Sequence, residues 1–198
     1  RFYIEVDCQQ KNHEGERICG DVFLSERIKT EGRTIVVLSD GMGHGIKANM
    51  LATLTATMAL NFTKEHKDVN RIAEIIMNTL PVCSQRRISY STFTIVDIES
   101  NGRTTILEYD NPNALIFRDG KKFDPEWKCI ILQSEKNAGK ELRSCTFDAQ
   151  IEDRIIFCSD GISQSGLGSD KYPFGFGVDN IEAFVKRLIT NDPKISAY

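Results

Sequence analysis

Several features are scarce or absent in this sequence, and each absence removes a class of protein. The 198 residues contain no apolar run near the roughly 20 residues that cross a bilayer, and no signal-type segment opens the chain. A formal charge of −3 leaves too little clustered basic surface for binding nucleic acid. No low-complexity tract, Pro-rich linker or internal repeat divides the chain. We therefore expect one cytoplasmic domain, residues 1–198, that contacts neither nucleic acid nor membrane.

The cysteines are also arranged without a pattern that would indicate a metal site or a disulfide framework. No C-x-x-C pair occurs, and most of the six lie inside apolar, strand-like runs: Cys8, Cys19, Cys83, Cys129, Cys145 and Cys158. Buried free thiols in a reducing cytosol are the simplest interpretation.

The first residues open directly on an alternating strand-like run after Arg1, without an initiator methionine. We therefore expect a fragment whose upstream regions are missing. A membrane anchor in those regions is left open.

Periodicity predicts strands first, then two helices, then many strands and a last helix. Strands are predicted at 2–10, 18–25, 33–39, 92–98, 104–109, 115–117, 129–132, 143–147 and 154–158. A helix of about 18 residues follows Gly45, with Ile46, Met50, Leu54 and Met58 as its core-facing stripe. A second helix begins near the N-cap Asp68 and ends before Pro81. The last helix places Ile181, Phe184, Val185, Leu188 and Ile189 on one face. This order is not the βαβ alternation of a parallel sheet, so an α+β sandwich is predicted.

One short pattern occurs twice. A buried strand ends in Ser-Asp-Gly at 39–41 and again at 159–161. A carboxylate fixed at the end of a buried strand is costly unless a cation meets it, and a neighbouring glycine lets the backbone come close. Hard divalent cations such as Mg²⁺ and Mn²⁺ prefer carboxylate and carbonyl oxygens. Asp40, Gly41 and Asp160 are therefore candidate metal ligands.

A third carboxylate lies in a similar context. Asp21 follows Gly20 inside an otherwise apolar strand, where aspartate is disfavoured. One such aspartate would be read as a turn or cap residue, but three in matching contexts favour a metal site.

Taken together, Gly20-Asp21-Val22-Phe23, the loop at 39–45 (Ser-Asp-Gly-Met-Gly-His-Gly) and Phe157-Cys158-Ser159-Asp160-Gly161 resemble one family in order and spacing. The chain resembles the bacterial metal-dependent phosphatases of the sporulation stage II protein E type, within the protein phosphatase 2C superfamily. The resemblance covers nearly the whole chain, including the turn at Asn111-Pro112.

The resemblance implies an αββα sandwich of two antiparallel sheets flanked by helices, with two divalent cations, Mn²⁺ or Mg²⁺, at one edge. It assigns the metals to Asp21, Asp40, Asp160 and the carbonyl of Gly41, with Asp40 bridging both ions. The implied reaction is hydrolysis of phosphoserine or phosphothreonine by a metal-activated water. The implied substrate is a phosphorylated partner protein, such as an anti-sigma-factor antagonist in partner switching. A homodimer is left open.

The sequence departs from this family near its end. Family members carry a further metal-binding aspartate before the last strand, and Asp192, followed by Pro193, does not match it. We expect the missing C-terminal helix or strand to weaken one metal position, so the activity of this chain is expected to be low.

Neighbouring polar residues receive no catalytic role. A general-acid role for His44 is weighed, but an orienting role between two glycines is favoured. Ser39 and Ser159 are expected to bond the loop backbone, because no histidine stands at the spacing of a nucleophilic serine.

Two other functions are left open. One is a phosphatase-fold module, catalytically weak or inactive, that acts by binding. The other is nucleotide binding of the histidine-kinase and gyrase type, but its glycines fall two and four residues after the aspartate, whereas here they fall one, three and five after Asp40. A phosphate loop ending in Gly-Lys-Ser/Thr is absent.

Overall fold

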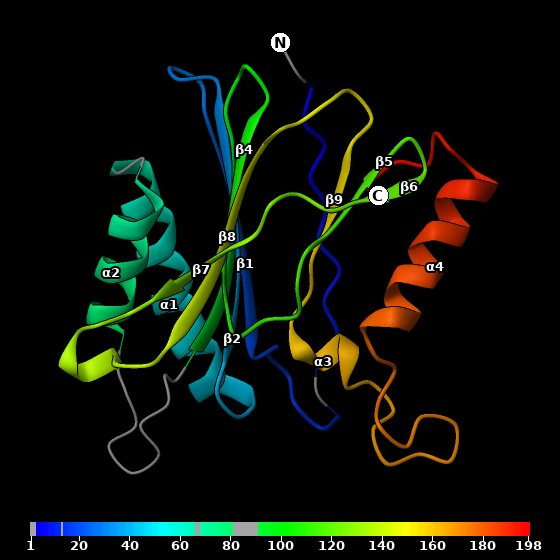
Figure 1. Cartoon of the computed structure of the whole chain (residues 1–198). Helices are drawn as coiled ribbons and strands as arrows, with labels where there is room; N and C mark the ends of the chain where they lie inside the picture. Colours follow the sequence, from blue (N-terminus) through cyan, green and yellow to red (C-terminus); the bar gives the residue numbers. More distant parts are fainter. Residues whose placement is uncertain (1–2, 13, 66–67, 81–90) are drawn as a thin grey trace.

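The computed structural model describes residues 3–12, 14–65, 68–80 and 91–198 and shows four layers (Figure 1). Two helices, α1 (Gly45–Glu65) and α2 (Val69–Thr79), form one outer layer. A six-stranded antiparallel sheet and a three-stranded antiparallel sheet form the middle layers. The fourth layer is α4 (Val178–Asn191), beside the smaller sheet. The predicted αββα sandwich is confirmed.

The larger sheet has the order β1-β2-β3-β4-β8-β7, and the smaller sheet has the order β6-β5-β9. The larger sheet consists of β1 (Asp21–Ile28), β2 (Arg33–Gly41), β3 (Ser91–Ile98), β4 (Arg103–Tyr109), β7 (Lys128–Ile131) and β8 (Glu141–Asp148). The smaller sheet consists of β5 (Leu115–Arg118), β6 (Lys121–Phe123) and β9 (Arg154–Ile156). Two short helical turns complete the fold, η1 (Glu135–Asn137) and α3 (Asp160–Ser163).

Strand β2 is buried on both faces, which explains its unbroken apolar sequence. Ile35 and Val37 pack in the core beneath the helices, whereas Val36 packs in the core between the two sheets. Side chains alternate along a strand, so successive residues enter opposite cores. Asp40 has the same parity as Val36, so its side chain faces the space between the sheets at the end of the strand.

The contact face of α1 differs from the prediction. Ile46, Met50 and Leu54 are 63%, 66% and 48% exposed, and the buried residues are small: Gly45, Ala48, Ala52, Thr55, Ala56, Ala59 and Thr63. The physical reason is a close approach between helix and sheet. A Cβ added to Gly41 would lie only 1.9 Å from the carbonyl oxygen of Ala48. Large side chains do not fit at that separation, so the prediction is wrong for Ile46, Met50 and Leu54. Met58, later in the helix, is partly buried against the core beneath the helices, as predicted.

Helix α2 follows its sequence signals. Asp68 caps it by accepting a 2.8 Å hydrogen bond from the backbone N–H of Arg71. Ile72, Ala73 and Ile76 are buried as predicted. Pro81 lies outside the described residues.

Several other boundaries also differ from the prediction. Residues 3–10 form no strand, β1 begins at Asp21 rather than at residue 18, and β9 ends at Ile156, three residues before Ser159. On α4, Ile181 and Ile189 are buried but Phe184 and Leu188 are exposed, because one helix against a three-stranded sheet covers only a narrow stripe. Of the five described cysteines, all free, only Cys145 is fully buried, and Cys129 is exposed.

A buried ion pair joins the far end of β2 to the end of α1. Arg33, 3% exposed, donates to both carboxylate oxygens of Asp97 at 2.8 and 2.6 Å. The same guanidinium donates to the carbonyl of Thr63 at 2.7 Å and to that of Lys64 at 3.4 Å, in the last turn of α1. A cation at a helix carboxyl end is favourable. The strand and the helix are therefore fixed together at this end as well as at Gly41.

Within the described residues, no helix combines the length and the apolar character required to span a bilayer.

Candidate metal centre

Two of the predicted ligands are direct neighbours in the larger sheet. Asp21, the first residue of β1, pairs with Asp40, the penultimate residue of β2. Directly paired residues of antiparallel strands project from the same face with their Cβ atoms about 5 Å apart. Two carboxylates therefore meet at one end of the sheet, on the side that faces the second sheet.

The third carboxylate comes from the segment that follows β9 of the smaller sheet. Asp160 begins α3, directly after Ser159, and the Ser159 hydroxyl donates a 2.6 Å hydrogen bond to Asp21. Asp160 accepts a 3.1 Å hydrogen bond from the side-chain amide of Gln164, one turn later. The structure thus brings Asp21, Asp40 and Asp160 together from three separate segments.

The electrostatics of Asp40 show how close the three groups are. Burial, together with the negative charges of the neighbouring Asp21 and Asp160, raises the pKa of Asp40 to about 8. Like charges that share a desolvated site disfavour ionisation. The group at the middle of the cluster therefore holds its proton near neutral pH unless a cation compensates the charge.

The donor set fits hard divalent cations. It consists of the carboxylate oxygens of the three aspartates, which are ligands that Mg²⁺ and Mn²⁺ prefer, as is a backbone carbonyl such as that of Gly41, the residue after Asp40. In the part of the chain that the structure describes, no group of three or more His, Cys, Asp or Glu side chains is arranged so that it could hold a metal ion as it stands. Asp160 is exposed, so the cluster opens to solvent and has room for water ligands.

The two serines of the repeated motif have different roles. Ser39 is buried and donates a 2.8 Å hydrogen bond to the carbonyl of Thr92 on β3, so it bonds the backbone, although of a neighbouring strand rather than of its own loop. Ser159 was also expected to bond the backbone, and this is wrong, because its partner is the carboxylate of Asp21. Ser159 therefore connects the second motif to the first strand.

His44 is paired with a residue that sequence reasoning missed. Its Nδ1 atom lies 2.6 Å from Oε1 of Glu16, and its side chain is 64% exposed. A Cβ added to Gly45, whose φ is +69°, would lie 2.6 Å from Oε2 of Glu16. The carboxylate thus lies against the start of α1, where an anion is favourable. The contact supports an orienting role for this pair, and no sequence spacing indicated Glu16.

Asp110 is a second missed residue. It has a left-handed φ of 56°, and its pKa is raised by burial and by the charge of Asp160. The next residue, Asn111, accepts from the Thr92 hydroxyl at 2.6 Å and donates to the Thr94 hydroxyl at 3.1 Å. Thr92 is the strand partner of Asp40. The turn at Asn111-Pro112 was part of the family resemblance, but the sequence could not place Asp110 beside the acidic cluster.

Asp192 has a separate role. It ends α4 and accepts a 3.1 Å hydrogen bond from the backbone N–H of Lys194, as a turn residue does.

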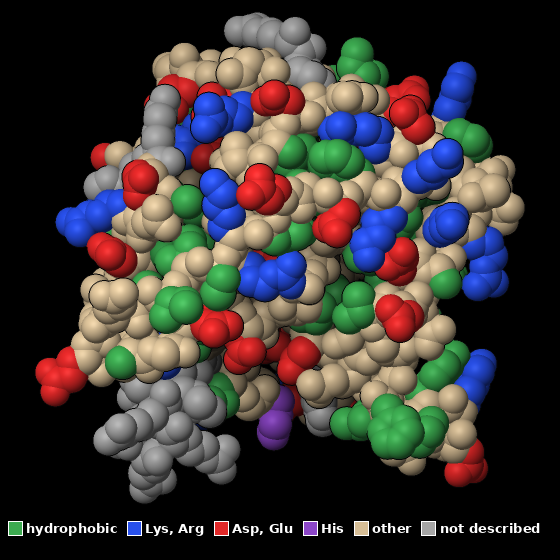
Figure 2. All heavy atoms as spheres, viewed as in Figure 1, with side chains coloured by type: hydrophobic (Ala, Val, Ile, Leu, Met, Phe, Trp, Pro, Cys, Tyr) green, Lys and Arg blue, Asp and Glu red, His purple; other side chains and the backbone are tan. Residues whose placement is uncertain are grey.

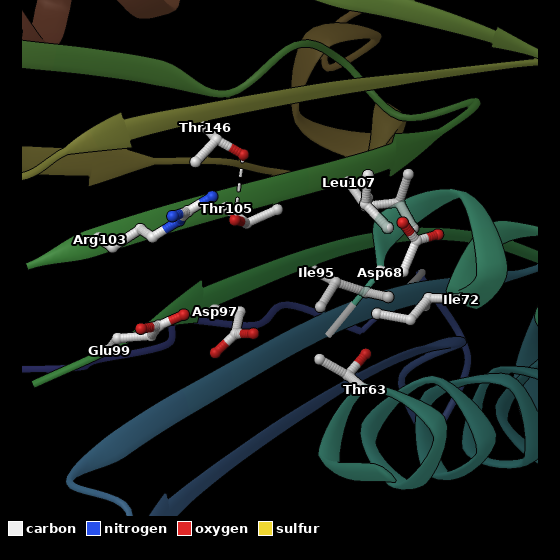
Figure 3. A pocket seen from close by; sticks show the side chains of 11 residues that line it. Thr63, Asp68, Ile72, Ile95, Asp97, Glu99, Arg103, Thr105, Leu107 and Thr146 are labelled. Carbon is white, nitrogen blue, oxygen red and sulfur yellow. Dashed lines mark hydrogen bonds between the residues drawn. The ribbon is translucent and has the colours of Figure 1, made fainter. Parts of the chain in front are cut away.

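A cavity of about 500 Å³ lies at the opposite end of the larger sheet, between that sheet and the two helices (Figure 3). Its acidic lining residues include Asp68, which caps α2, and Asp97, which is paired with Arg33. Asp21, Asp40 and Asp160 do not line the cavity, so it is separate from the acidic cluster. In Figure 2, acidic side chains gather at the lower edge of the molecule, where Figure 1 shows α3.

Comparison with known proteins gives a family match and structural neighbours. The family model described as stage II sporulation protein E (SpoIIE) matches residues 30–188. No curated protein sequence is significantly similar to the chain.

Three solved structures illustrate the fold. A chain of the bacterial stressosome, described as a modular system adapted to control secondary messenger signalling, is 20% identical with a TM-score of 0.60, over 79% of this chain and 77% of that one. The PP2C phosphatase domain of SpoIIE from Bacillus subtilis, with a fragment of its regulatory domain, is 19% identical with a TM-score of 0.60, over 85% of this chain and 45% of that one. RsbX in complex with magnesium is 21% identical with a TM-score of 0.59. The match covers 90% of this chain and 84% of the RsbX chain.

Proposed function

We propose, from the premise that the chain belongs to the SpoIIE family, that it is a divalent-metal-dependent phosphatase acting on phosphoserine or phosphothreonine of a partner protein. The observation that carries the proposal is the convergence of Asp21, Asp40 and Asp160 at one edge of the sandwich. The PP2C-like fold shared with SpoIIE and RsbX supports it.

Asp21, Asp40, Asp160 and the carbonyl of Gly41 would hold the ions. Two cations, Mn²⁺ or Mg²⁺, would supply the Lewis acidity that activates water and neutralises phosphate oxygens. RsbX, a structural neighbour, is in complex with magnesium. Asp40 interacts with both of the other carboxylates and would contact both ions.

The remaining residues hold the ligands in position. Ser159 fixes Asp21 through one carboxylate oxygen, and Gln164 fixes Asp160. Asn111 holds the loop that carries Asp110 against β3. Such outer contacts commonly change metal affinity by about 10- to 100-fold when removed.

The proposed partner is a phosphorylated regulatory protein in a bacterial partner-switching pathway, such as an anti-sigma-factor antagonist. Neighbours of this chain include the stressosome chain and the RsbU and RsbW domains of Rv1364c from Mycobacterium tuberculosis, the latter 17% identical with a TM-score of 0.58. The shared fold is the support for this assignment.

The test is hydrolysis of a phosphoserine peptide and of p-nitrophenyl phosphate with Mn²⁺, with Mg²⁺ and with chelator. Asp40→Asn is expected to abolish both activities, whereas Asp148→Asn, at an exposed position of β8, keeps them. Hydrolysis that survived both Asp40→Asn and chelation would overturn the mechanism. Metal binding without any hydrolysis would favour the alternative of a phosphatase-fold binding module.

A further inference from the structure

A loop at residues 164–177, which we call the 164–177 loop, follows α3 and has a defined structure of its own. Its ends are joined by a 2.7 Å hydrogen bond from Gly177 N–H to the carbonyl of Ser163. Inside it, Gly168 bonds the carbonyl of Pro173 at 3.2 Å, and the rings of Tyr172 and Phe176 pack edge to face at 5.4 Å. Loops with close ends that pack on their own side chains are frequently functional.

The same region presents large apolar side chains to solvent. Phe174 is 92% exposed and Leu167 is 61% exposed, and Ile162 in α3 is 49% exposed. Figure 2 shows hydrophobic side chains gathered at the lower right, where Figure 1 places this loop, beside the acidic side chains of the lower edge. Contiguous exposed apolar side chains next to a polar site are a feature of interaction surfaces.

The loop is attached to the acidic cluster by short contacts. Gln164 donates from its backbone N–H to the carbonyl of Asp160 at 2.7 Å and from its side chain to the Asp160 carboxylate at 3.1 Å. A Cβ added to Gly175 would lie 2.9 Å from the Cα of Gln164, so the backbone next to Phe174 packs against the first turn after Asp160. One helical turn plus one side chain separates Phe174 from the cluster, a span of roughly 10–15 Å.

We propose that the 164–177 loop is the docking surface for the phosphoprotein substrate, with Phe174 and Leu167 receiving a bulky apolar side chain of the substrate. The inference rests on the proposed phosphatase function. An extended peptide advances about 3.3 Å per residue, so the apolar residue would lie about three to five positions from the phosphorylated one. A protein substrate is the occupant that fits, because its phosphate can reach the acidic cluster while a flanking apolar side chain reaches Phe174 and Leu167.

The experiment uses serine phosphopeptides in which a single leucine replaces alanine at each of the five positions on either side of the phosphoserine. Both kcat/KM in Mn²⁺ and binding of fluorescein-labelled peptides by anisotropy are measured. For the unmodified protein, leucine at the matching position is expected to raise kcat/KM and affinity by about tenfold, as burial of one leucine would. Phe174→Ser and Leu167→Ser are expected to remove most of that gain, because the side chain loses its apolar partner.

Phe184→Ser is the matched control, because Phe184 is a half-exposed phenylalanine on α4, seven residues beyond the end of the loop. It should keep the leucine gain. Thermal melting checks that each variant is folded. An equal leucine gain in Phe174→Ser, or no preferred position at all, would overturn the docking surface.

The two proposals fail in different ways. Absence of p-nitrophenyl phosphate hydrolysis in Mn²⁺ contradicts the phosphatase, whereas the anisotropy series still decides whether the loop selects leucine peptides. A change in oligomeric state of Phe174→Ser without peptide would instead identify the surface as a contact between two copies and reject the proposal.

Discussion

The hydroxyl of Ser159 donates a 2.6 Å hydrogen bond to the carboxylate of Asp21, 138 positions earlier in the sequence. The bond joins the first strand of one sheet to the segment that leaves the other. Because Ser159 is only 4% exposed, water cannot readily take the place of its hydroxyl as the donor to Asp21. The second Ser-Asp-Gly motif therefore supplies both a candidate ligand and a positioning group for another ligand.

The first prediction concerns this bond. Ser159→Ala removes the donor that orients Asp21, so the affinity for Mn²⁺ is expected to fall about 10- to 100-fold. Isothermal titration calorimetry measures it. Ser39→Ala is the matched control from the first motif, since Ser39 bonds only a backbone carbonyl. Equal losses of affinity in the two variants would show that Ser159 acts only through the fold.

The second prediction concerns pH. Burial, Asp21 and Asp160 raise the pKa of Asp40 from 3.8 to about 8, so between these values the folded protein holds a proton that the unfolded chain has lost. The contribution of this protonation to the free energy of unfolding is fully present below about pH 4 and is lost as the pH rises towards 8. In chelator, the melting temperature should fall by on the order of 5 °C from pH 5 to pH 8.

Two comparisons test that assignment. Asp40→Asn should reduce the fall, because the amide does not titrate, and Mn²⁺ should stabilise the unmodified protein more at pH 8 than at pH 5. A metal-free protein whose stability rises over this interval would contradict the effect.

The third prediction concerns the buried ion pair of Arg33 and Asp97. Arg33→Gln leaves Asp97 without its cation and removes donors from the end of α1, so the free energy of unfolding should fall by about 3 kcal/mol. Urea denaturation measures it. Arg71→Ala breaks an exposed pair of 3.7 Å with Glu74 and should cost under about 0.5 kcal/mol. Similar losses in both variants would show that burial adds nothing to the pair.

The fourth prediction concerns Glu108, which is 3% exposed on β4. One carboxylate oxygen accepts a 2.6 Å hydrogen bond from the N–H of Ala114, and the other has no hydrogen-bond partner among the residues that the structure describes. Burial raises its pKa to about 7. Glu108→Gln keeps the acceptor and should remain close to the unmodified protein in stability at pH 7. Glu108→Ala leaves the N–H unpaired and should cost about 2 kcal/mol in urea denaturation.

Much of the architecture was predictable from local sequence. The apolar run of β2, the capped face of α2 and the hairpin of β3 and β4 each carry a signal within ten or so residues. The family and the sandwich were likewise indicated by three short motifs. The candidate ligands were also identified from strand ends, although their role in binding metal stays a prediction.

The failures have one physical cause, which is that local pattern does not report distance between elements. The large apolar residues of α1 suggested its buried face, but the close approach at Gly41 and Ala48 selects alanines instead. The hydrogen bond of Ser159 to Asp21 and the contact of Glu16 with His44 join segments far apart in the chain. Neither has a sequence spacing that could reveal it.

The acidic cluster draws its members from positions 21, 40 and 160, which meet only in the folded chain. In the unfolded chain these carboxylates are far apart, so it binds a divalent ion only weakly. Any ion that binds the cluster therefore stabilises the native state by mass action. Once its concentration exceeds the dissociation constant, the added free energy of unfolding grows with the logarithm of the ratio of concentration to dissociation constant. Thermal shifts against metal concentration would then yield site affinities before any substrate is known.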